Sequence, residues 1–114
     1  MELFNLTIHE LHDKLKKGDP QLKLLKEYDQ SYRKAFGTEA STFGGYAYDA
    51  FQLIVAAVKK GGANKEQIRS GIEKQNKLIA VSGVFSMSEK DHNGLDLSAF
   101  EMVKIVKGDW VIAR

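Results

Sequence analysis

Two histidines near the N-terminus have a spacing that suits a shared metal ion. His9 and His12 are three residues apart, and Asp13 follows at once. Residues at positions i and i+3 of a helix are neighbours on its surface, so these side chains would lie close together. The cluster brings no further ligand at a fixed spacing. We therefore favour a solvated helix face, keep metal binding as the open alternative, and predict no metal site.

A third histidine, His92, lies between Asp91 and the dipeptide Asn93-Gly94. Together with Asp91 it has the chemistry of a metal-ligand pair or of a general base. Asn-Gly, however, is a strong turn signal. We interpret His92 as a turn residue.

The remaining polar residues do not make a recognisable catalytic arrangement. The carboxylates show no pairing that would raise a pKa for acid–base chemistry; those considered are Asp29, Asp49, Glu66 and Glu73. Gly44-Gly45 lacks the preceding strand and the spacing of a nucleotide-binding loop. The chain has no cysteine, which excludes thiolate catalysis and cysteine zinc sites. The sequence therefore predicts no enzyme and no cofactor.

Length and charge limit the function classes further. With 114 residues, the chain suffices for a single domain over residues 1–114. Its 17 basic and 15 acidic residues nearly balance, so no basic surface for nucleic acid is expected. The longest apolar run, Leu53 to Val58, is too short to span a bilayer. The N-terminal residues lack the apolar core and small-residue cleavage site of a secretory signal.

Two helices are predicted in the first third of the chain. Thr7 and Glu10 have the spacing of a capping box, which predicts a helix over residues 8–17, with Leu6 and Leu11 placed as a hydrophobic staple. Asp19-Pro20 has the form of a helix start, because aspartate caps and proline tolerates the first position. The second helix ends at Gly37 and presents one apolar face; that face comprises Leu22, Leu25, Tyr28, Tyr32 and Phe36.

The middle of the chain predicts a long buried helix. Residues 43–60 are apolar almost all round, which favours burial on most sides, with Tyr46, Tyr48 and Phe51 in the core. Asn64 then caps a short helix that contains Gly71.

Residues 78–87 and two later segments are predicted to be extended. Residues 78–87 have a break at Ser82-Gly83, and residues 88–95 read as a turn. Residues 100–106 and 110–112 flank Lys107-Gly108-Asp109, which indicates a hairpin. The fold class is therefore α+β in this chain: three to four helices followed by an antiparallel β ribbon.

The two glycines at the mouth of the long helix raise a question of packing or ligand binding. Glycine permits a backbone or a ligand to approach closely, and a helix N-terminus favours an anion. Phe43, beside Gly44 and Gly45, would pack on a small ligand or on a neighbouring loop. Both alternatives stay open at this level.

The ordered motifs resemble a known family. Tyr48-Asp49-Ala50 opens a helix, Gly83-Val84-Phe85 forms a strand, Asp91–Gly94 makes a turn, and a Lys-Gly-x-Trp hairpin closes the chain at residues 107–110. From about residue 19 onward, this order resembles the C-terminal third of branched-chain amino-acid (leucine/isoleucine/valine) type solute-binding proteins of ABC transporters, which have the α/β periplasmic-binding-protein type I fold. Residues 1–18 match less well.

The resemblance implies a function and a location. In the family, a ligand such as an amino acid is captured between two lobes that close by a hinge, and the loaded protein delivers it to an ABC permease outside the cytoplasm. The family implies that Thr42, Phe43 and Gly44 face the cleft between the lobes and bind ligand, whereas Tyr48 and Asp49 are structural.

A chain of this length corresponds to about a third of such a protein and lacks most ligand contacts. We therefore expect no ligand binding by the chain alone. A long apolar helix with incomplete cover predicts a homodimer. The alternative function is a free-standing small domain for self-association or regulation.

Overall fold

The computed structural model describes residues 7–113, and the expected staple contact of Leu6 lies outside that range. Within it, four α-helices are followed by two separate two-stranded antiparallel sheets. The expected order of helices first and an antiparallel ribbon last is confirmed. The difference is that the extended middle segment forms a small sheet of its own.

The first helix, α1 (Ile8–Lys14), begins at the predicted capping box. The Thr7 side chain accepts a hydrogen bond from the Glu10 backbone N–H, and the Glu10 carboxylate accepts one from the Thr7 N–H. The helix ends at Lys14, three residues earlier than expected, because Leu15 adopts an extended conformation.

The second helix, α2 (Leu22–Phe36), begins two residues later than Pro20 suggested. Pro20 and Gln21 form a turn instead, closed by the Leu22 N–H on the Asp19 carbonyl. The predicted end is confirmed, since Gly37 caps the helix in the left-handed conformation that glycine adopts without strain.

Helices α3 (Thr42–Gly61) and α4 (Lys65–Glu73) pack closely against each other. Asn64 caps α4 with a full capping box, as predicted. Gly71 is buried at the contact, where an added Cβ would lie 2.7 Å from the Ala57 Cβ. This close approach explains why a helix interior tolerates a glycine that lowers helix propensity by about 1 kcal/mol.

The extended part of the chain forms two hairpins. β1 (Leu78–Ile79) pairs with β2 (Val84–Phe85), and β3 (Val103–Val106) pairs with β4 (Asp109–Ile112). A 3-10 helix at Leu97–Ala99 delays the start of β3 beyond Phe100. The second hairpin turns at Lys107-Gly108, both with positive φ, as the two-residue turns that match strand twist require.

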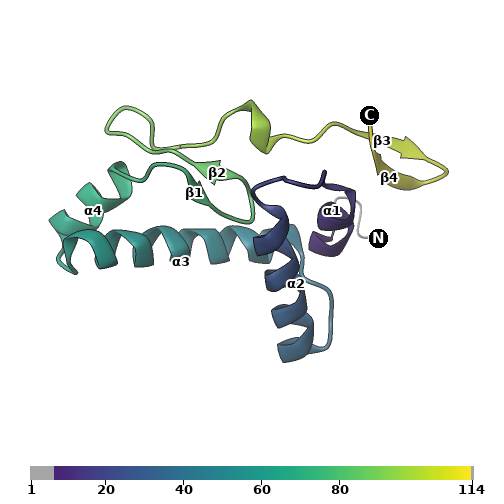
Figure 1. The fold of residues 1–114 in the computed structure, drawn as a ribbon, viewed down its shortest axis with the longest axis horizontal. Helices are drawn as coiled ribbons and strands as arrows, with labels where there is room; N and C mark the ends of the chain where they lie inside the picture. The colour runs from purple at the N-terminus through teal and green to yellow at the C-terminus, as the bar shows by residue number, and fades with distance from the viewer. Residues whose placement is uncertain (1–6, 114) are drawn as a thin grey trace.

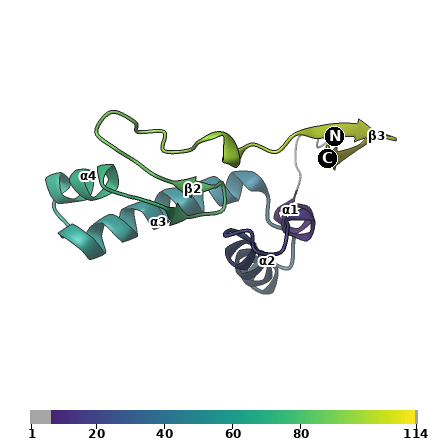
Figure 2. The same cartoon turned by 45° about the horizontal axis from the view of Figure 1, so that its top comes forward.

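The elements are arranged around α3, which runs along the longest axis (Figure 1). Helix α4 lies beside the C-terminal half of α3, and α2 projects sideways from its N-terminal end. The β1–β2 hairpin and the C-terminal segment lie over the same side of α3 (Figure 2). The β3–β4 hairpin extends beyond the N-terminal end of α3, which helps to give extents of 50 × 32 × 30 Å.

A buried carboxylate joins α3 to the loop between β1 and β2. Asp49 is 2% exposed, and its two oxygens accept hydrogen bonds of 2.7 Å from the backbone N–H groups of Val81 and Ser82. From the other side, the Gln21 amide donates to the carbonyls of Ala80 and Val81. The structural role expected for Asp49 is confirmed.

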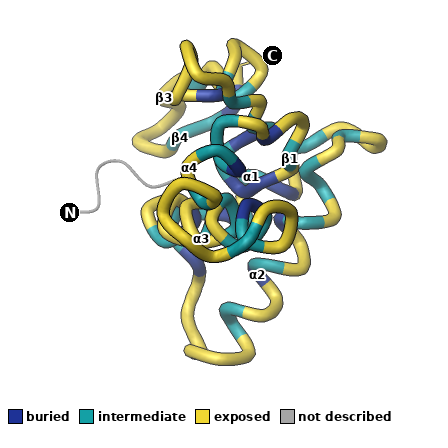
Figure 3. Tube along the Cα trace, turned by 90° about the vertical axis from the view of Figure 1, so that its left-hand side faces the viewer, coloured by how far each residue is buried: buried dark blue, intermediate teal, exposed yellow. Residues whose placement is uncertain are grey.

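The hydrophobic core is small and lies where α1, α2 and α3 meet that loop. Its buried members are Ile8, Leu25, Ala40 and Val81, with Tyr28 and Tyr48 among the partly buried residues around them. Away from this junction most of the backbone is exposed or half-buried (Figure 3). The accessible surface is 8304 Å², whereas a folded monomer of this mass exposes about 6,300 Å².

Two aromatic residues expected in the core, and one from the predicted apolar face of the second helix, are exposed. Tyr46 and Phe51 on α3 are 55% and 62% exposed, and Phe36 at the end of α2 is also exposed. The sequence correctly predicted that α3 is apolar. The described residues, however, pack against only part of the circumference of this helix. Its exposed face carries four large apolar side chains, which we call the α3 stripe: Phe43, Tyr46, Phe51 and Ile54.

Within residues 7–113, none of the helices combines the length and apolarity needed to cross a bilayer.

Replacing Asp49 by alanine is predicted to lower the free energy of unfolding by about 3 kcal/mol, because two backbone N–H groups lose their acceptor in a poorly hydrated position. Urea unfolding followed by circular dichroism measures the change. Asp109→Ala is the matched control, since Asp109 is exposed at the start of β4. Equal unfolding midpoints for the two variants would contradict the role assigned to Asp49.

Candidate functional site

A cleft of about 360 Å³ lies at the N-terminal end of α3. Its walls come from α1, the start of α2, the β1–β2 loop and the C-terminal segment. The residues that line it include Leu11, Gln21, Thr42, Tyr46, Ser82 and Trp110. The cleft is therefore assembled from five parts of the chain that are distant in sequence.

The structure places the three predicted ligand residues differently with respect to this cleft. Thr42 lines the cleft and is half-buried. Phe43 is 64% exposed and packs edge-on against Tyr46, with ring centroids 6.0 Å apart, on the α3 stripe. Gly44 faces α2, where an added Cβ would lie 3.3 Å from the Tyr28 hydroxyl. Only Thr42 of the three contributes to the cleft wall.

The second glycine has a packing role. Gly45 is buried, and an added Cβ would lie 2.6 Å from a methyl carbon of Val81. The loop held by Asp49 thus approaches the backbone of α3 at this point. At Gly45 the structure supports the packing interpretation of the glycine pair.

The cleft is mostly apolar with a few polar groups at its edge. Asp19, Gln21 and Glu101 lie on its lining, and the Asp19 carboxylate accepts from the Gln21 backbone N–H. The Ser82 hydroxyl oxygen is buried and has no hydrogen-bond partner among the described residues. Such a lining suits binding of a small molecule. The described residues of the cleft bring no nucleophile and base together.

The sequence did not predict Tyr46 as a lining residue, because the aromatic residues of α3 were expected in the core.

Tyr28, on the neighbouring face, stays a neutral hydroxyl: burial raises its pKa, and the nearby Tyr32 and Asp49 raise it further. A protonated Tyr28 fits its position against Gly44.

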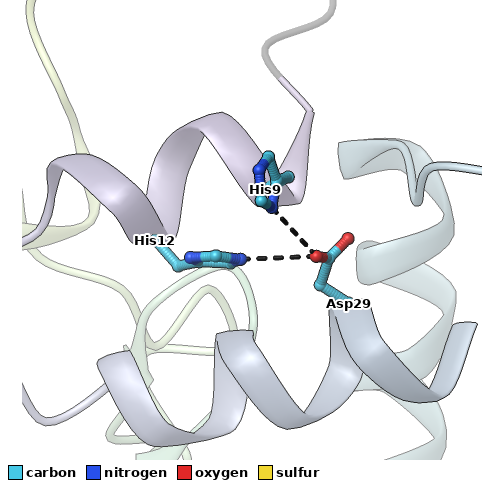
Figure 4. Close-up of side chains that lie close together, drawn as sticks. All are labelled: His9, His12 and Asp29. Atoms are coloured by element: carbon cyan, nitrogen blue, oxygen red, sulfur yellow. Dashed lines mark hydrogen bonds and ion pairs between the residues drawn. The ribbon is translucent and has the colours of Figure 1, made fainter. Parts of the chain in front are cut away.

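The expectation of a solvated helix face is corrected for His12, which is buried, whereas His9 and Asp13 on the same helix keep side-chain exposures of 44% and 59%. His12 is 7% exposed, and its Nε2 lies 3.3 Å from the Asp29 Oδ2. His9 Nδ1 lies 3.2 Å from the same oxygen (Figure 4). The carboxylate that both histidines contact, that of Asp29, belongs to α2. Asp29 lies four residues after Leu25, on the apolar face of that helix. This position in the sequence is the signal that indicates the burial of Asp29.

Asp29 is held as a carboxylate by its neighbours. Burial raises its pKa, but hydrogen bonds from Arg33, His12 and His9 outweigh that effect and hold the pKa below its usual value. The cluster lies outside the lining of the cleft.

His92 lies in a turn, as predicted. The Asp91 carboxylate accepts hydrogen bonds from the Asn93 and Gly94 backbone N–H groups, and these bonds lower its pKa. The His92 ring points to Glu73 on α4, with Nε2 3.3 Å from a carboxylate oxygen. This histidine is exposed and belongs to neither the cleft nor the N-terminal cluster.

Comparison with known proteins gives matches only among solved structures. No family model matches the chain, and no curated protein matches it. An extracellular ligand-binding receptor from Rhodopseudomonas palustris HaA2 superposes with a TM-score of 0.78 at 22% identity, covering 96% of this chain and 33% of that chain. A second receptor from the same strain gives 0.70 at 24% identity, and a protein of strain CGA009 gives 0.76 at 22% identity.

This chain spans about a third of the length of the structures that it resembles. Each of the last two superpositions covers 90% of this chain and 31% of the chain compared with it. Four helices and two small antiparallel sheets correspond to that part of an α/β periplasmic-binding fold. At these identities the similarity establishes the fold. The resemblance drawn from the sequence is thus confirmed at that level: the chain has the fold of about one third of an extracellular ligand-binding receptor, in agreement with the C-terminal part of a type I periplasmic-binding protein.

Proposed function

We propose that the chain is the C-terminal part of an extracellular or periplasmic solute-binding protein of the branched-chain amino-acid type. The observation that carries this proposal is the superposition of 96% of the chain on one third of a ligand-binding receptor. The two comparison proteins from strain HaA2 are named as extracellular ligand-binding receptors, which supports binding rather than catalysis. In this proposal the ligand is an amino acid or a similar small molecule, and an ABC permease receives it.

The exposed apolar surface supports the proposed role as part of a larger fold. Beyond Phe43 and Tyr46 at the helix mouth, the α3 stripe continues with Phe51 and Ile54, which form an exposed apolar face on a 20-residue helix. In a doubly wound α/β protein, such a face packs against a parallel sheet. The remaining two thirds of a receptor would supply that sheet and bury the roughly 2,000 Å² by which this chain exceeds a compact monomer.

The cleft at the start of α3 is the proposed contribution to the ligand site. Thr42 lines the cleft wall. Phe43, exposed at the same helix mouth, would meet the ligand or the opposite lobe once the receptor is whole and closed, whereas Gly44 faces α2 and would contribute only the close approach of its backbone. The apolar lining of the cleft suits an aliphatic side chain, and the charged ends of an amino acid would be bound by the missing part.

The chain alone is predicted not to bind leucine, isoleucine or valine with micromolar affinity. A zwitterion placed against these residues would leave its charged ends without partners, which costs several kcal/mol. Isothermal titration calorimetry with each amino acid checks this. Micromolar binding by the isolated chain would contradict the assignment of the polar contacts to the missing part.

The role itself is tested in the longer protein. The proposal predicts that the coding sequence adjoins a reading frame for the first two thirds of a receptor, and that the joined chain binds an aliphatic amino acid. In that chain, Phe43→Ala should weaken binding about tenfold, because a large aromatic contact is worth more than 1 kcal/mol. Phe36→Ala is the matched control, since Phe36 is the exposed last residue of α2.

A joined chain that binds none of the three amino acids would contradict the branched-chain assignment. Equal weakening by both substitutions would contradict the role of Phe43.

A self-associating small domain is the second candidate, favoured by the same α3 stripe. Soluble monomers rarely expose apolar patches beyond a few hundred Å², and a two-fold contact is the commonest way to bury such a patch against its copy. In this candidate the chain works alone, and the stripe is its interface.

The chain is therefore predicted to form a homodimer at micromolar concentration, with twice the monomer mass of 12.8 kDa in sedimentation equilibrium. Ile54→Glu should return it to a monomer, because a charge in the middle of the stripe cannot be buried without a partner. Ala63→Glu, in the exposed loop after α3, adds the same charge as a control. A wild-type monomer that binds no apolar dye would contradict this prediction.

A further inference from the structure

One carboxylate oxygen is the meeting point of two imidazoles from another helix. The Oδ2 atom of Asp29, on α2, lies 3.2 Å from His9 Nδ1 and 3.3 Å from His12 Nε2, both on α1 (Figure 4). All three atoms lie within 4.8 Å of one another. We propose that His9, His12 and Asp29 bind a divalent transition-metal ion of the Zn²⁺ class, which joins α1 to α2.

The distances suit a tetrahedral ion. Ligand atoms about 2.1 Å from Zn²⁺ lie about 3.4 Å from each other in a tetrahedron. Two of the three edges already have this length, between Asp29 and each histidine. The third edge, between the imidazoles, closes by a rotation of the His9 ring, which is half-buried and lies edge-on to the His12 ring with centroids 4.9 Å apart. Three protein ligands leave the fourth position to water.

The charges around the cluster favour a cation. Arg33 Nε donates to both oxygens of Asp29, at 3.0 and 3.1 Å, and another nitrogen of its guanidinium donates to Glu39 at 2.8 Å. With an ion on Oδ2, Arg33 keeps Oδ1. Asp13, Asp29 and Glu39 together outweigh the single guanidinium by two negative charges, which a divalent ion balances.

A second carboxylate lies behind the two rings. Asp13 Oδ2 is 3.6 Å from His9 Nε2, and Asp13 Oδ1 is 3.0 Å from His12 Nδ1. The latter nitrogen is buried, and the direction of this contact falls outside hydrogen-bond geometry. Metal-bound histidines usually donate their other N–H group to a carboxylate or carbonyl. Asp13 lies next to both rings, and it would become their acceptor when the rings reorient around an ion.

The ion also resolves a mismatch in hydrogen bonding. Each imidazole lies between two carboxylates, Asp29 on one side and Asp13 on the other. A neutral imidazole has only one N–H donor, so one nitrogen of each ring faces an acceptor with its lone pair. With a cation between Asp29 and the rings, those lone pairs bind the ion and both N–H groups turn to Asp13.

The test uses the full chain with Zn²⁺ alone, measured by competition with a chromophoric chelator, and with Co²⁺, whose visible spectrum reports geometry. Micromolar Zn²⁺ binding at a stoichiometry of one and a tetrahedral Co²⁺ spectrum are expected. His9→Gln and Asp29→Asn should each weaken Zn²⁺ binding more than tenfold, since even the loss of an outer partner such as Asp13 costs roughly tenfold. His92→Gln is the matched control.

Imidazole NMR signals provide a readout that needs no substitution, should a variant at buried Asp29 or His12 fail to fold. Addition of Zn²⁺ should shift the signals of His9 and His12 and leave His92 unchanged. The proposal is overturned if wild-type chain binds Zn²⁺ no better than His9→Gln, if His92→Gln removes the binding, or if the signals of His9 and His12 do not respond.

Discussion

The arrangement of the whole chain depends on one buried carboxylate. Asp49 projects from α3 and binds two consecutive backbone N–H groups at Val81 and Ser82. A carboxylate with two such bonds is well compensated for its burial. The contact places a loop from the second half of the chain directly on the helix, and the side chain of Val81 then completes the core with Ile8 and Leu25. Polar and apolar contacts therefore meet at one residue.

The same contact explains the glycine at the helix mouth and the position of the cleft. Because the loop is drawn onto α3, the backbone at Gly45 has no room for a side chain. Thr42, one turn earlier, then faces the space between the loop, α1 and the C-terminal segment. A helix N-terminus, a clamped loop and a remote hairpin form a cleft only because Asp49 and Gln21 fix the loop from two sides.

Local signals in the sequence predicted the boundaries of several elements well. Thr7, Asn64 and Gly37 cap their helices, and Lys107-Gly108 turns the last hairpin. Each of these features depends only on residues within one turn of the chain, so the local sequence is enough to predict it. The start of α2 was set two residues too early for a related reason: an aspartate followed by proline starts either a helix or a turn, and the chain here makes the turn first.

Burial was harder to predict because it depends on partners that a local pattern does not identify. Asp49 is charged and nevertheless buried, whereas the aromatic side chains of Tyr46 and Phe51 are exposed. A helical period shows which residues share a face, but it does not show which face is covered. In a chain with the fold of one third of a larger protein, the apolar face of a helix can have its natural cover outside the chain.

The N-terminal cluster illustrates the same limit for chemistry. The sequence predicted that His9 and His12 are neighbours. The carboxylate that completes the proposed metal site, that of Asp29, lies on the next helix. Asp29 is distinguished by its position: it occupies a place on the apolar face of α2 between Leu25 and Tyr32, where a charge persists only with partners. A charged residue at an apolar position of a helix therefore marks a tertiary contact, and the histidines that its helix partner carries are the natural candidates for that contact.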